Sequence, residues 1–274
     1  MTHSGADIRA LLDRHGLSAR RALGQNFVVD PNTVRKIAAL SGVGPGDSVV
    51  EIGPGLGSLT LALLESGAAV TAVEMDTELI PVLEEVVGGR DVTIVEGDAQ
   101  AVDWSTVLGS ASEWQLVANL PYNVATPLIL DLLREVPQIV SMVVMVQLEV
   151  AERLVAGPGD RAIGIPSVLV AFHGTAEIVA RVPPTVFHPR PRVDSAVIRL
   201  ARHAEPPVDA PPAMIEALVR AAYNQRRKMI RTSLAGLLDE QAIEGAGVDP
   251  QARPETLTLD EWGRLAQARP SRPR

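Results

Sequence analysis

Short apolar runs and amphipathic segments alternate along the first half of the chain. The runs are rich in β-branched residues and bounded by glycine, proline or aspartate, so they predict buried strands. In the segments between them, apolar residues recur with the spacing of an α-helix. Asp30-Pro31 is typical of a helix N-terminus, and Gly67 is typical of a helix C-cap. The predicted strands are residues 48–52, 69–73, 92–95, 114–118 and 139–146, and the predicted helices are residues 5–16, 31–40, 59–64, 77–87 and 125–134. This order, with its short links, predicts a parallel, doubly wound α/β sheet.

The pattern changes after residue 146. Three strands are predicted without helices between them, which favours an antiparallel edge of the sheet. A stiff proline-rich loop interrupts them, and a proline-rich acidic stretch then precedes a run of helices. The predicted strands are residues 167–172, 175–182 and 193–200, the loop is residues 183–192, the acidic stretch is residues 204–212, and the helices are residues 147–156, 213–223, 226–238, 241–245 and 259–268. We therefore expect two domains, residues 1–203 around the sheet and residues 204–274 entirely helical.

Three glycines lie on the turn between the strand at 48–52 and the helix that follows it. Gly53, Gly55 and Gly57 tolerate positive φ and let a ligand approach the backbone closely. Glu74 ends the next strand, where a carboxylate can accept both ribose hydroxyls of an adenosine cofactor. This arrangement suits NAD and S-adenosylmethionine equally well, and the alternative is that the glycines only turn the chain.

Composition narrows the class of protein. The chain has 274 residues, of which 46% are hydrophobic, and it contains no cysteine. Disulfides, zinc-thiolate sites and cysteine nucleophiles are thereby excluded. The chain has no uncharged apolar run of about 18 residues and no basic-then-apolar leader, so we expect a cytoplasmic protein without a membrane span.

The charge is unevenly distributed. The net charge of −8 argues against a general nucleic-acid binder, but residues 47–115 hold thirteen acids and one base, whereas residues 181–232 hold ten bases and four acids. A polyanion could therefore bind a face made by the two ends of the chain. The alternative is that the arginine-rich helices only present solvated faces.

Several motifs together resemble the rRNA adenine dimethyltransferases. The motifs are L-G-Q-N-F at 23–27, E-I-G-P-G-L-G at 51–57, V-E-M-D at 73–76, G-D-A at 97–99 and N-L-P-Y at 119–122. Three further segments are closest to the small-subunit, KsgA-like branch, namely 146–151, 186–197 and 225–231. The resemblance covers roughly residues 8–240, and it departs from the family pattern at Leu148 and at residues 163–167, which bears on rRNA docking.

The resemblance implies a class I methyltransferase fold, which is a Rossmann-like seven-stranded sheet with a small all-helical C-terminal domain. It also implies dimethylation of the exocyclic N6 amine of two adjacent adenosines near the 3′ end of 16S rRNA, in the assembling 30S subunit. The methyl donor would be S-adenosylmethionine, the product S-adenosylhomocysteine, and no metal is required. We expect a monomer.

The N-L-P-Y motif supplies the chemistry that such a transfer needs. The amine's lone pair is delocalised into the adenine ring, and acceptors aimed at its N–H bonds can realign that pair. The Asn119 side-chain oxygen and the Leu120 carbonyl are these acceptors, and Pro121 stiffens the turn. Tyr122 offers a ring on which the base can stack, and Phe187 is predicted to be the second ring.

The other expected contacts fall into two groups. For the cofactor we expect Gln25, Asn26, Gly53, Gly55, Glu74, Met75, Asp98, Ala99 and Asn119. For RNA phosphates we expect Arg20, Arg21, Arg190, Arg192, Arg226, Arg227, Lys228 and Arg231. The competing interpretations are an Erm-type 23S rRNA dimethylase, a non-catalytic assembly factor on the same fold, and an NAD(P)-dependent oxidoreductase, which would lack an acid for hydride chemistry.

Overall fold

The computed structural model describes residues 2–268, with the exception of the Arg21 side chain. Its contacts divide the chain into two compact units. The larger comprises the residues up to Ala151 together with Glu177–Arg202, and the smaller comprises Glu152–Ala176 and the residues from His203 onward. One division thus falls a single residue before the expected boundary, whereas residues 152–176 group with the C-terminal helices and not with the sheet.

The larger unit is built on one seven-stranded sheet in the order β4-β3-β2-β5-β6-β9-β7. Its strands are β2 (Ser48–Ile52), β3 (Ala69–Glu74), β4 (Val92–Glu96), β5 (Trp114–Asn119), β6 (Ile139–Gln147), β7 (Gly174–Val182) and β9 (Ser195–Arg202). The first five pair in parallel, and β9 runs antiparallel to β6 with Met145 opposite Val197. The parallel sheet with an antiparallel edge was predicted correctly from the sequence.

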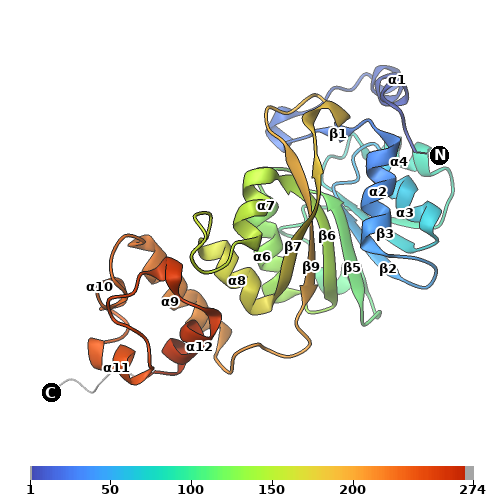
Figure 1. The fold of residues 1–274 in the computed structure, drawn as a ribbon. Helices are drawn as coiled ribbons and strands as arrows, with labels where there is room; N and C mark the ends of the chain where they lie inside the picture. Colours follow the sequence, from blue (N-terminus) through green and yellow to red (C-terminus); the bar gives the residue numbers. More distant parts are fainter. Residues whose placement is uncertain (1, 269–274) are drawn as a thin grey trace. The chain divides into compact units, whose positions relative to one another are not determined.

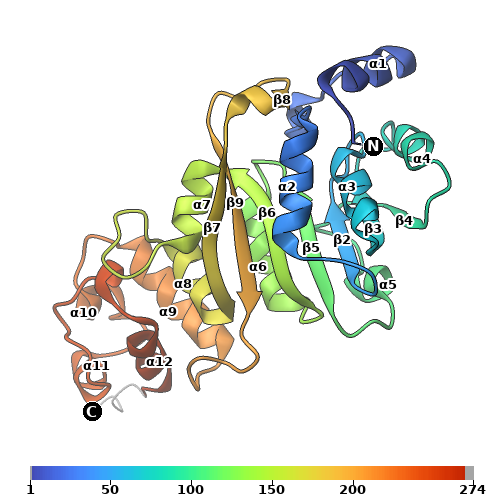
Figure 2. The same cartoon turned by 45° about the vertical axis from the view of Figure 1, so that its right-hand side comes forward.

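Helices cover both faces of this sheet. Figure 2 shows α2 (Pro31–Ser41) in front of the central strands and α6 (Ala125–Glu135) behind them. Asp30 caps α2 by accepting from the Thr33 amide, and Pro31 occupies the first helical position, as its fixed φ favours. The remaining helices of this region are α1 (Gly5–His15), α3 (Ser58–Ser66), α4 (Ile80–Val87) and α5 (Trp104–Leu108), and α7 (Leu148–Val155) begins in the larger unit and ends in the smaller one.

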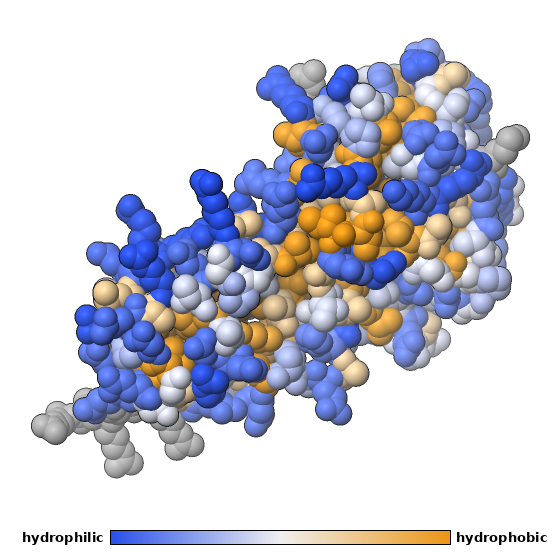
Figure 3. Space-filling view, viewed as in Figure 1, coloured by the Kyte–Doolittle hydropathy of each residue, from blue (hydrophilic) through white to orange (hydrophobic). Residues whose placement is uncertain are grey.

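The core lies between α2, α3 and the sheet. Val49, Leu63 and Val117 are fully buried there, each with 0% exposure. The strands are apolar on both faces because helices cover both, as parallel sheets require. Hydrophilic side chains cover most of the face seen in Figure 3, with hydrophobic areas on both units, the broadest of them on the larger unit. This construction leaves the carboxyl ends of β2, β3, β4 and β5 together at one edge.

A second, small sheet joins distant parts of the larger unit. Strand β1 (Phe27–Val28) pairs antiparallel with β8 (Phe187–His188), so Val28 lies opposite Phe187. A short 3-10 turn, Pro184–Val186, precedes β8, and another, Arg21–Leu23, precedes β1. Figure 1 shows β1 beside the loop that joins β7 to β9. The extended loop predicted for residues 183–192 is therefore partly a strand.

The smaller unit is mainly helical, although Gly174–Ala176 begin β7, and here two predictions were wrong. Residues 167–172 were expected to form a strand, but they lie within α8 (Ile165–His173). Residues 226–238 were expected to form one helix, but only α10 (Ile230–Ser233) is helical there. The unit also contains α9 (Pro212–Asn224), α11 (Glu240–Gly245), a 3-10 turn at Pro254–Thr256 and α12 (Leu259–Gln267), with α9 contacting α8, α10 and α12.

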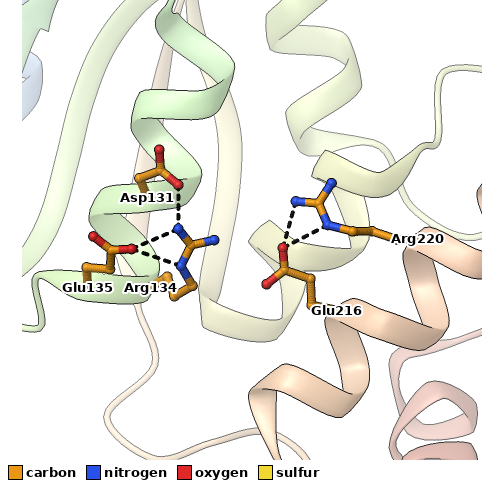
Figure 4. A network of polar contacts seen from close by, with 5 residues as sticks. All are labelled: Asp131, Arg134, Glu135, Glu216 and Arg220. Carbon is orange, nitrogen blue, oxygen red and sulfur yellow. Dashed lines mark hydrogen bonds and ion pairs between the residues drawn. The ribbon is translucent and has the colours of Figure 1, made fainter. Parts of the chain in front are cut away.

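Exposed ion pairs lie on helices of each unit, as Figure 4 shows. On α6, one terminal nitrogen of Arg134 lies 2.8 Å from both Asp131 and Glu135. On α9, Arg220 donates to one oxygen of Glu216, four residues earlier, at 2.6 and 2.8 Å. Pairs of this exposed kind contribute little to stability individually. No helix among residues 2–268 has the length and apolar character needed to cross a membrane.

Candidate active site

The glycine turn after β2 forms the floor of a cavity at the carboxyl edge of the sheet. Gly53 and Gly55 have φ angles of 68° and 57°, in the left-handed region that favours glycine. The Gly53 amide donates to the Val73 carbonyl at 2.9 Å, which ties the turn to β3. A Cβ added to Gly55 would lie 3.1 Å from the Phe27 ring, whereas one added to Gly53 would meet open space. The backbone at Gly53 is therefore open to a ligand.

Glu74, at the end of β3, holds this turn in place. One of its carboxylate oxygens accepts from the Gly55 amide at 3.0 Å, and the other accepts from the Asp76 amide at 2.8 Å. The side chain is buried, and burial raises its pKa despite these two donors. Each oxygen keeps a further lone pair for a ribose hydroxyl. The same side chain can therefore shape the turn and bind a nucleoside.

Two further predicted positions lie at the ends of neighbouring strands. Met75 follows Glu74 and is 52% exposed, so its thioether can cover a ring without disturbing the core. Asp98 follows β4, and its carboxylate accepts from the Gln100 amide at 2.9 Å. Ala99 is buried beside it. This group presents an apolar face and an acceptor, which suits an adenine base.

The N-L-P-Y segment follows β5 at the same edge. The Asn119 side-chain nitrogen donates to the Asn26 carbonyl at 3.1 Å, so its oxygen remains as the acceptor. The Leu120 amide donates to the Met145 carbonyl at 3.1 Å, which anchors the turn to β6. The Tyr122 hydroxyl lies 2.7 Å from the Ser195 hydroxyl. Partial burial raises the pKa of Tyr122, so its phenol stays protonated near neutral pH.

The segment before β1 forms another wall of the cavity. The Gln25 side-chain nitrogen donates to Asp76 at 2.7 Å, and its oxygen accepts from the Arg20 amide at 2.8 Å. The Arg20 guanidinium also pairs with Asp76, at 3.0 Å, and with Glu78. Asp76 thus connects this segment to the end of β3.

One cavity collects almost all of the predicted catalytic and cofactor residues. It is lined by Gln25, Asn26, Gly53, Gly55, Glu74, Met75, Asp98, Ala99, Asn119, Leu120, Pro121 and Tyr122. Phe187 is the exception, because it is 4% exposed, packs in the main core and is not among the lining residues. Phe187 lies opposite Val28 and packs with it in the core, and in this structure it does not line the cavity with Tyr122 as expected.

Three neighbouring residues were not predicted to take part. Glu51 lines the cavity from the end of β2 and is 1% exposed. Ser195 positions the Tyr122 hydroxyl, and Asp76 connects Arg20 with Gln25. Glu51 lies two positions before Gly53 and Asp76 lies two positions after Glu74, so their places within these motifs were the available signal. Ser195 lies within the segment 186–197 that resembles the family, but its place beside Tyr122 depends on the pairing of β9 with β6, which the local sequence does not show.

The predicted phosphate-binding residues divide into paired and unpaired groups. Arg226 pairs with Glu255 at 2.9 Å and donates to the Arg161 carbonyl, and Arg231 pairs with Glu240 at 2.9 Å. Arg20 is held by Asp76 and Glu78, as described above, and the Arg21 side chain lies outside the described part of the structure. Of this predicted set, and within the described residues, the exposed cations without an acidic partner are Arg190, Arg192, Arg227 and Lys228.

The fold and the cavity define a class I methyltransferase that uses S-adenosylmethionine. The parallel sheet carries an acid at the end of β3, an acid after β4 and an open glycine turn after β2, which are the contacts that an adenosine cofactor needs. When bound, S-adenosylmethionine supplies a methyl group on a positively charged sulfur.

Comparisons with known proteins identify the family. Residues 16–268 match the family described as ribosomal RNA adenine dimethylase, and the chain belongs to it. Proteins named ribosomal RNA small subunit methyltransferase A from Kineococcus radiotolerans and Streptomyces coelicolor are 46% and 45% identical, over 97% and 96% of this chain and 91% and 95% of theirs. It is therefore an rRNA adenine dimethyltransferase.

Solved structures agree with this fold. The 23S rRNA methyltransferase ErmE has a TM-score of 0.69 and 28% identity, covering 88% of this chain and 98% of its own. A dimethyladenosine transferase from Plasmodium falciparum has a TM-score of 0.71 over 86% of this chain and 94% of its own, and its 22% identity bears on the fold alone.

Proposed function

We propose that this enzyme dimethylates the N6 amines of two adjacent adenosines near the 3′ end of 16S rRNA in the assembling 30S subunit. The observation that carries the proposal is the placement of Asn119. Its side-chain oxygen remains available because its nitrogen is bound to the Asn26 carbonyl, and it lines the same cavity as Glu74 and Asp98. An amine acceptor and a nucleoside-cofactor site thus share one cavity.

Asn119 and Leu120 prepare the amine for attack. The Asn119 oxygen and the Leu120 carbonyl accept from the two N–H bonds, which draws the nitrogen toward tetrahedral geometry. The new N–C bond forms as the C–S bond breaks, the sulfur keeps the electron pair, and the amine's surplus proton leaves to solvent. No strong base is required, which fits an asparagine in place of an aspartate at this position.

Tyr122 positions the base. Its hydroxyl is held by Ser195 at 2.7 Å, so the ring orientation is fixed before the substrate arrives. A target adenine taken out of its stack can lie on this ring with its amine toward Asn119. Stacking on an aromatic ring contributes roughly 1–3 kcal/mol per base. Phe187 is left out of this assignment because it is buried in the core.

The small-subunit substrate is supported by the relatives. The proteins that are 46% and 45% identical carry small-subunit names, whereas the 23S rRNA enzyme ErmE is 28% identical. Exposed Arg227 and Lys228 of the smaller unit are available for rRNA phosphates. We further propose that the enzyme acts in the cytoplasm as a monomer.

The test is methylation of defined particles. Purified protein is incubated with undermethylated 30S particles and labelled S-adenosylmethionine, and the modified adenosines are mapped by primer extension and mass spectrometry. We expect two dimethylated adenosines near the 3′ end of 16S rRNA, and no labelling of naked 23S rRNA. Labelling of 23S rRNA alone would show that the enzyme is instead a 23S rRNA dimethylase of the Erm type.

A further inference from the structure

The ionisable side chains that line the cavity are acidic. Among the residues that the structure describes, its lining includes three carboxylates, Glu51, Glu74 and Asp98, and no lysine, arginine or histidine. Closely spaced carboxylates without a cation create a negative potential, which is strongest where water is excluded. The lining therefore favours a positively charged ligand over an uncharged ligand of the same shape.

The three carboxylates are not equivalent. Asp98 is exposed, so solvent can stabilise its charge, and Glu74 accepts from two backbone amides. Glu51 is 1% exposed, and within the described residues its hydrogen-bond donor is the Thr60 hydroxyl at 2.6 Å. Of the three groups, Glu51 is the most buried and receives no backbone donor. Its charge is therefore the least compensated by the protein.

Burial and two side chains, Thr60 and Glu74, act on the ionisation of Glu51. Burial raises the pKa of Glu51, the hydrogen bond from Thr60 of α3 lowers it, and the charge of Glu74 of β3 raises it. Together these effects bring the pKa to about 8. Near neutral pH the side chain therefore carries a proton when no cation is close. A cation placed in the cavity stabilises the ionised form and drives the proton off.

The methyl donor and its product differ in the charge on their sulfur atom. S-adenosylmethionine carries a sulfonium charge, whereas S-adenosylhomocysteine has a neutral thioether and is otherwise the same molecule without one methyl group. An enzyme must bind the first and release the second, although nearly all of their contacts are shared. A buried carboxyl that can change its charge is suited to this discrimination.

We propose that Glu51 is the residue by which the cavity distinguishes the cationic donor from the neutral product. It loses one proton to solvent when the donor binds, and it regains one from solvent after methyl transfer has left a neutral sulfur. Donor binding then strengthens as the pH rises toward 8, whereas product binding does not. This inference rests on the cofactor assignment and extends it to the selection of donor over product.

Isothermal titration calorimetry tests the proposal by counting protons. Each ligand is titrated at a pH of about 7 in several buffers that differ in ionisation enthalpy. The slope of the observed binding enthalpy against the ionisation enthalpy of the buffer gives the number of protons released on binding. For the wild-type protein we expect release of up to about one proton with S-adenosylmethionine and close to none with S-adenosylhomocysteine. Between pH of about 6 and 8, donor affinity should rise by as much as ~10-fold per unit.

Variants separate Glu51 from the other carboxylates. Glu51→Gln keeps an acceptor for Thr60, and it should bind both ligands with no donor-specific proton release. Glu51→Asp should restore the release, and Asp98→Asn, which removes one carboxylate from the same cavity, should retain it. Because each variant is compared with the wild type for the same ligand, ionisation of the ligand's own amino group cancels.

The outcomes are distinct. Proton release by wild-type protein that is the same for donor and product, or release that persists in Glu51→Gln, overturns the proposal while the cofactor assignment stands. Failure of the wild-type protein to bind either ligand would instead overturn the cofactor assignment. If Glu51→Gln does not fold, the pH dependence of wild-type affinity for the two ligands decides, and parallel curves refute the proposal.

Discussion

At the residue scale, one side-chain hydrogen bond of Asn119 determines which of its atoms is available for chemistry. The side-chain nitrogen donates to the Asn26 carbonyl, which leaves the side-chain oxygen as the acceptor for the amine. Asn119→Ala removes this oxygen, whereas the bond between Glu74 and the glycine turn stays in place. We expect kcat on 30S particles to fall by roughly 100-fold or more, as when one preorganised hydrogen bond to a transition state is removed. Affinity for S-adenosylmethionine, measured by calorimetry, should stay within a few-fold. Near wild-type turnover would show that the acceptor lies elsewhere.

Glu51 also predicts how stability depends on pH. Because its pKa is raised from an ordinary 4.5 to about 8 by burial, the folded protein holds this proton at pH values where the unfolded chain has lost it. Its contribution to the free energy of unfolding is therefore greatest below about 4.5 and is lost as the pH rises to about 8.

The measurement is urea denaturation of ligand-free protein across this range. Compared with Glu51→Gln, the wild type should lose stability steadily from pH 4.5 to pH 8 and show a constant difference above that. Parallel curves for the two proteins would mean that Glu51 is ionised throughout.

Local motifs could predict which residues line this cavity because these residues lie at strand ends. Gly53, Glu74 and Asn119 each follow a predictable strand, and the carboxyl ends of parallel strands meet at one edge. Phe187 could not be placed in this way. Its burial depends on pairing with Val28, far away in the sequence, and an exposed-looking loop gives no sign of that partner.

At the element scale, the stretch S-V-L-V-A-F at 167–172 shows where the sequence pattern fails. A short, continuous apolar run is compatible with a buried strand or a buried helix. The structure makes it part of α8, which contacts α9, so tertiary packing decided what periodicity left open. Residues 226–229 were expected to be helical, but they form a turn in which the Arg226 and Lys228 amides bond back to carbonyls three residues earlier.

Arg202 at the end of β9 holds the end of α6 against the start of β6. Its guanidinium donates to the carbonyls of Leu132, Leu133, Val136 and Ile139 at 2.7 to 3.2 Å. The Leu132 carbonyl also accepts from the Val136 amide, and the Val136 carbonyl from the Ile139 amide, so Arg202 supplements these bonds and adds one to the Leu133 carbonyl near the end of α6. The arginine thus replaces the glycine cap that ends α2 and α3.

Arg202→Met should therefore lower the free energy of unfolding by about 2–3 kcal/mol, because it removes a charged hydrogen-bond donor from the end of α6, including the donor to the Leu133 carbonyl. The matched control is Arg35→Met on α2, whose exposed pair with Glu65 has a distance of 3.4 Å and should change stability by less than about 0.5 kcal/mol. Chemical denaturation of both variants provides the comparison, and equal effects would mean that the carbonyls of α6 are satisfied without Arg202.

At the scale of the whole molecule, the acidic chain must bind a polyanion. Its net charge is −8, so binding requires cations that are not already neutralised by acids. The structure changes the prediction from sequence, in which all the bases of residues 226–231 were equivalent. Arg226 and Arg231 are paired with Glu255 and Glu240, whereas Arg227 and Lys228 are exposed without an acidic partner among the described residues.

Reversing Arg227 and Lys228 to glutamate should weaken binding to 30S particles and leave S-adenosylmethionine affinity unchanged. For each phosphate that the variant no longer neutralises, the slope of log affinity against log salt should become shallower by about 1. The control is the same double reversal at Arg35 and Lys36 on α2, an adjacent exposed pair that gives the same net charge. Filter binding over a salt series distinguishes the two variants. An identical loss of affinity in both would mean that net charge alone governs docking, and unchanged affinity in the first would remove this turn from the rRNA interface.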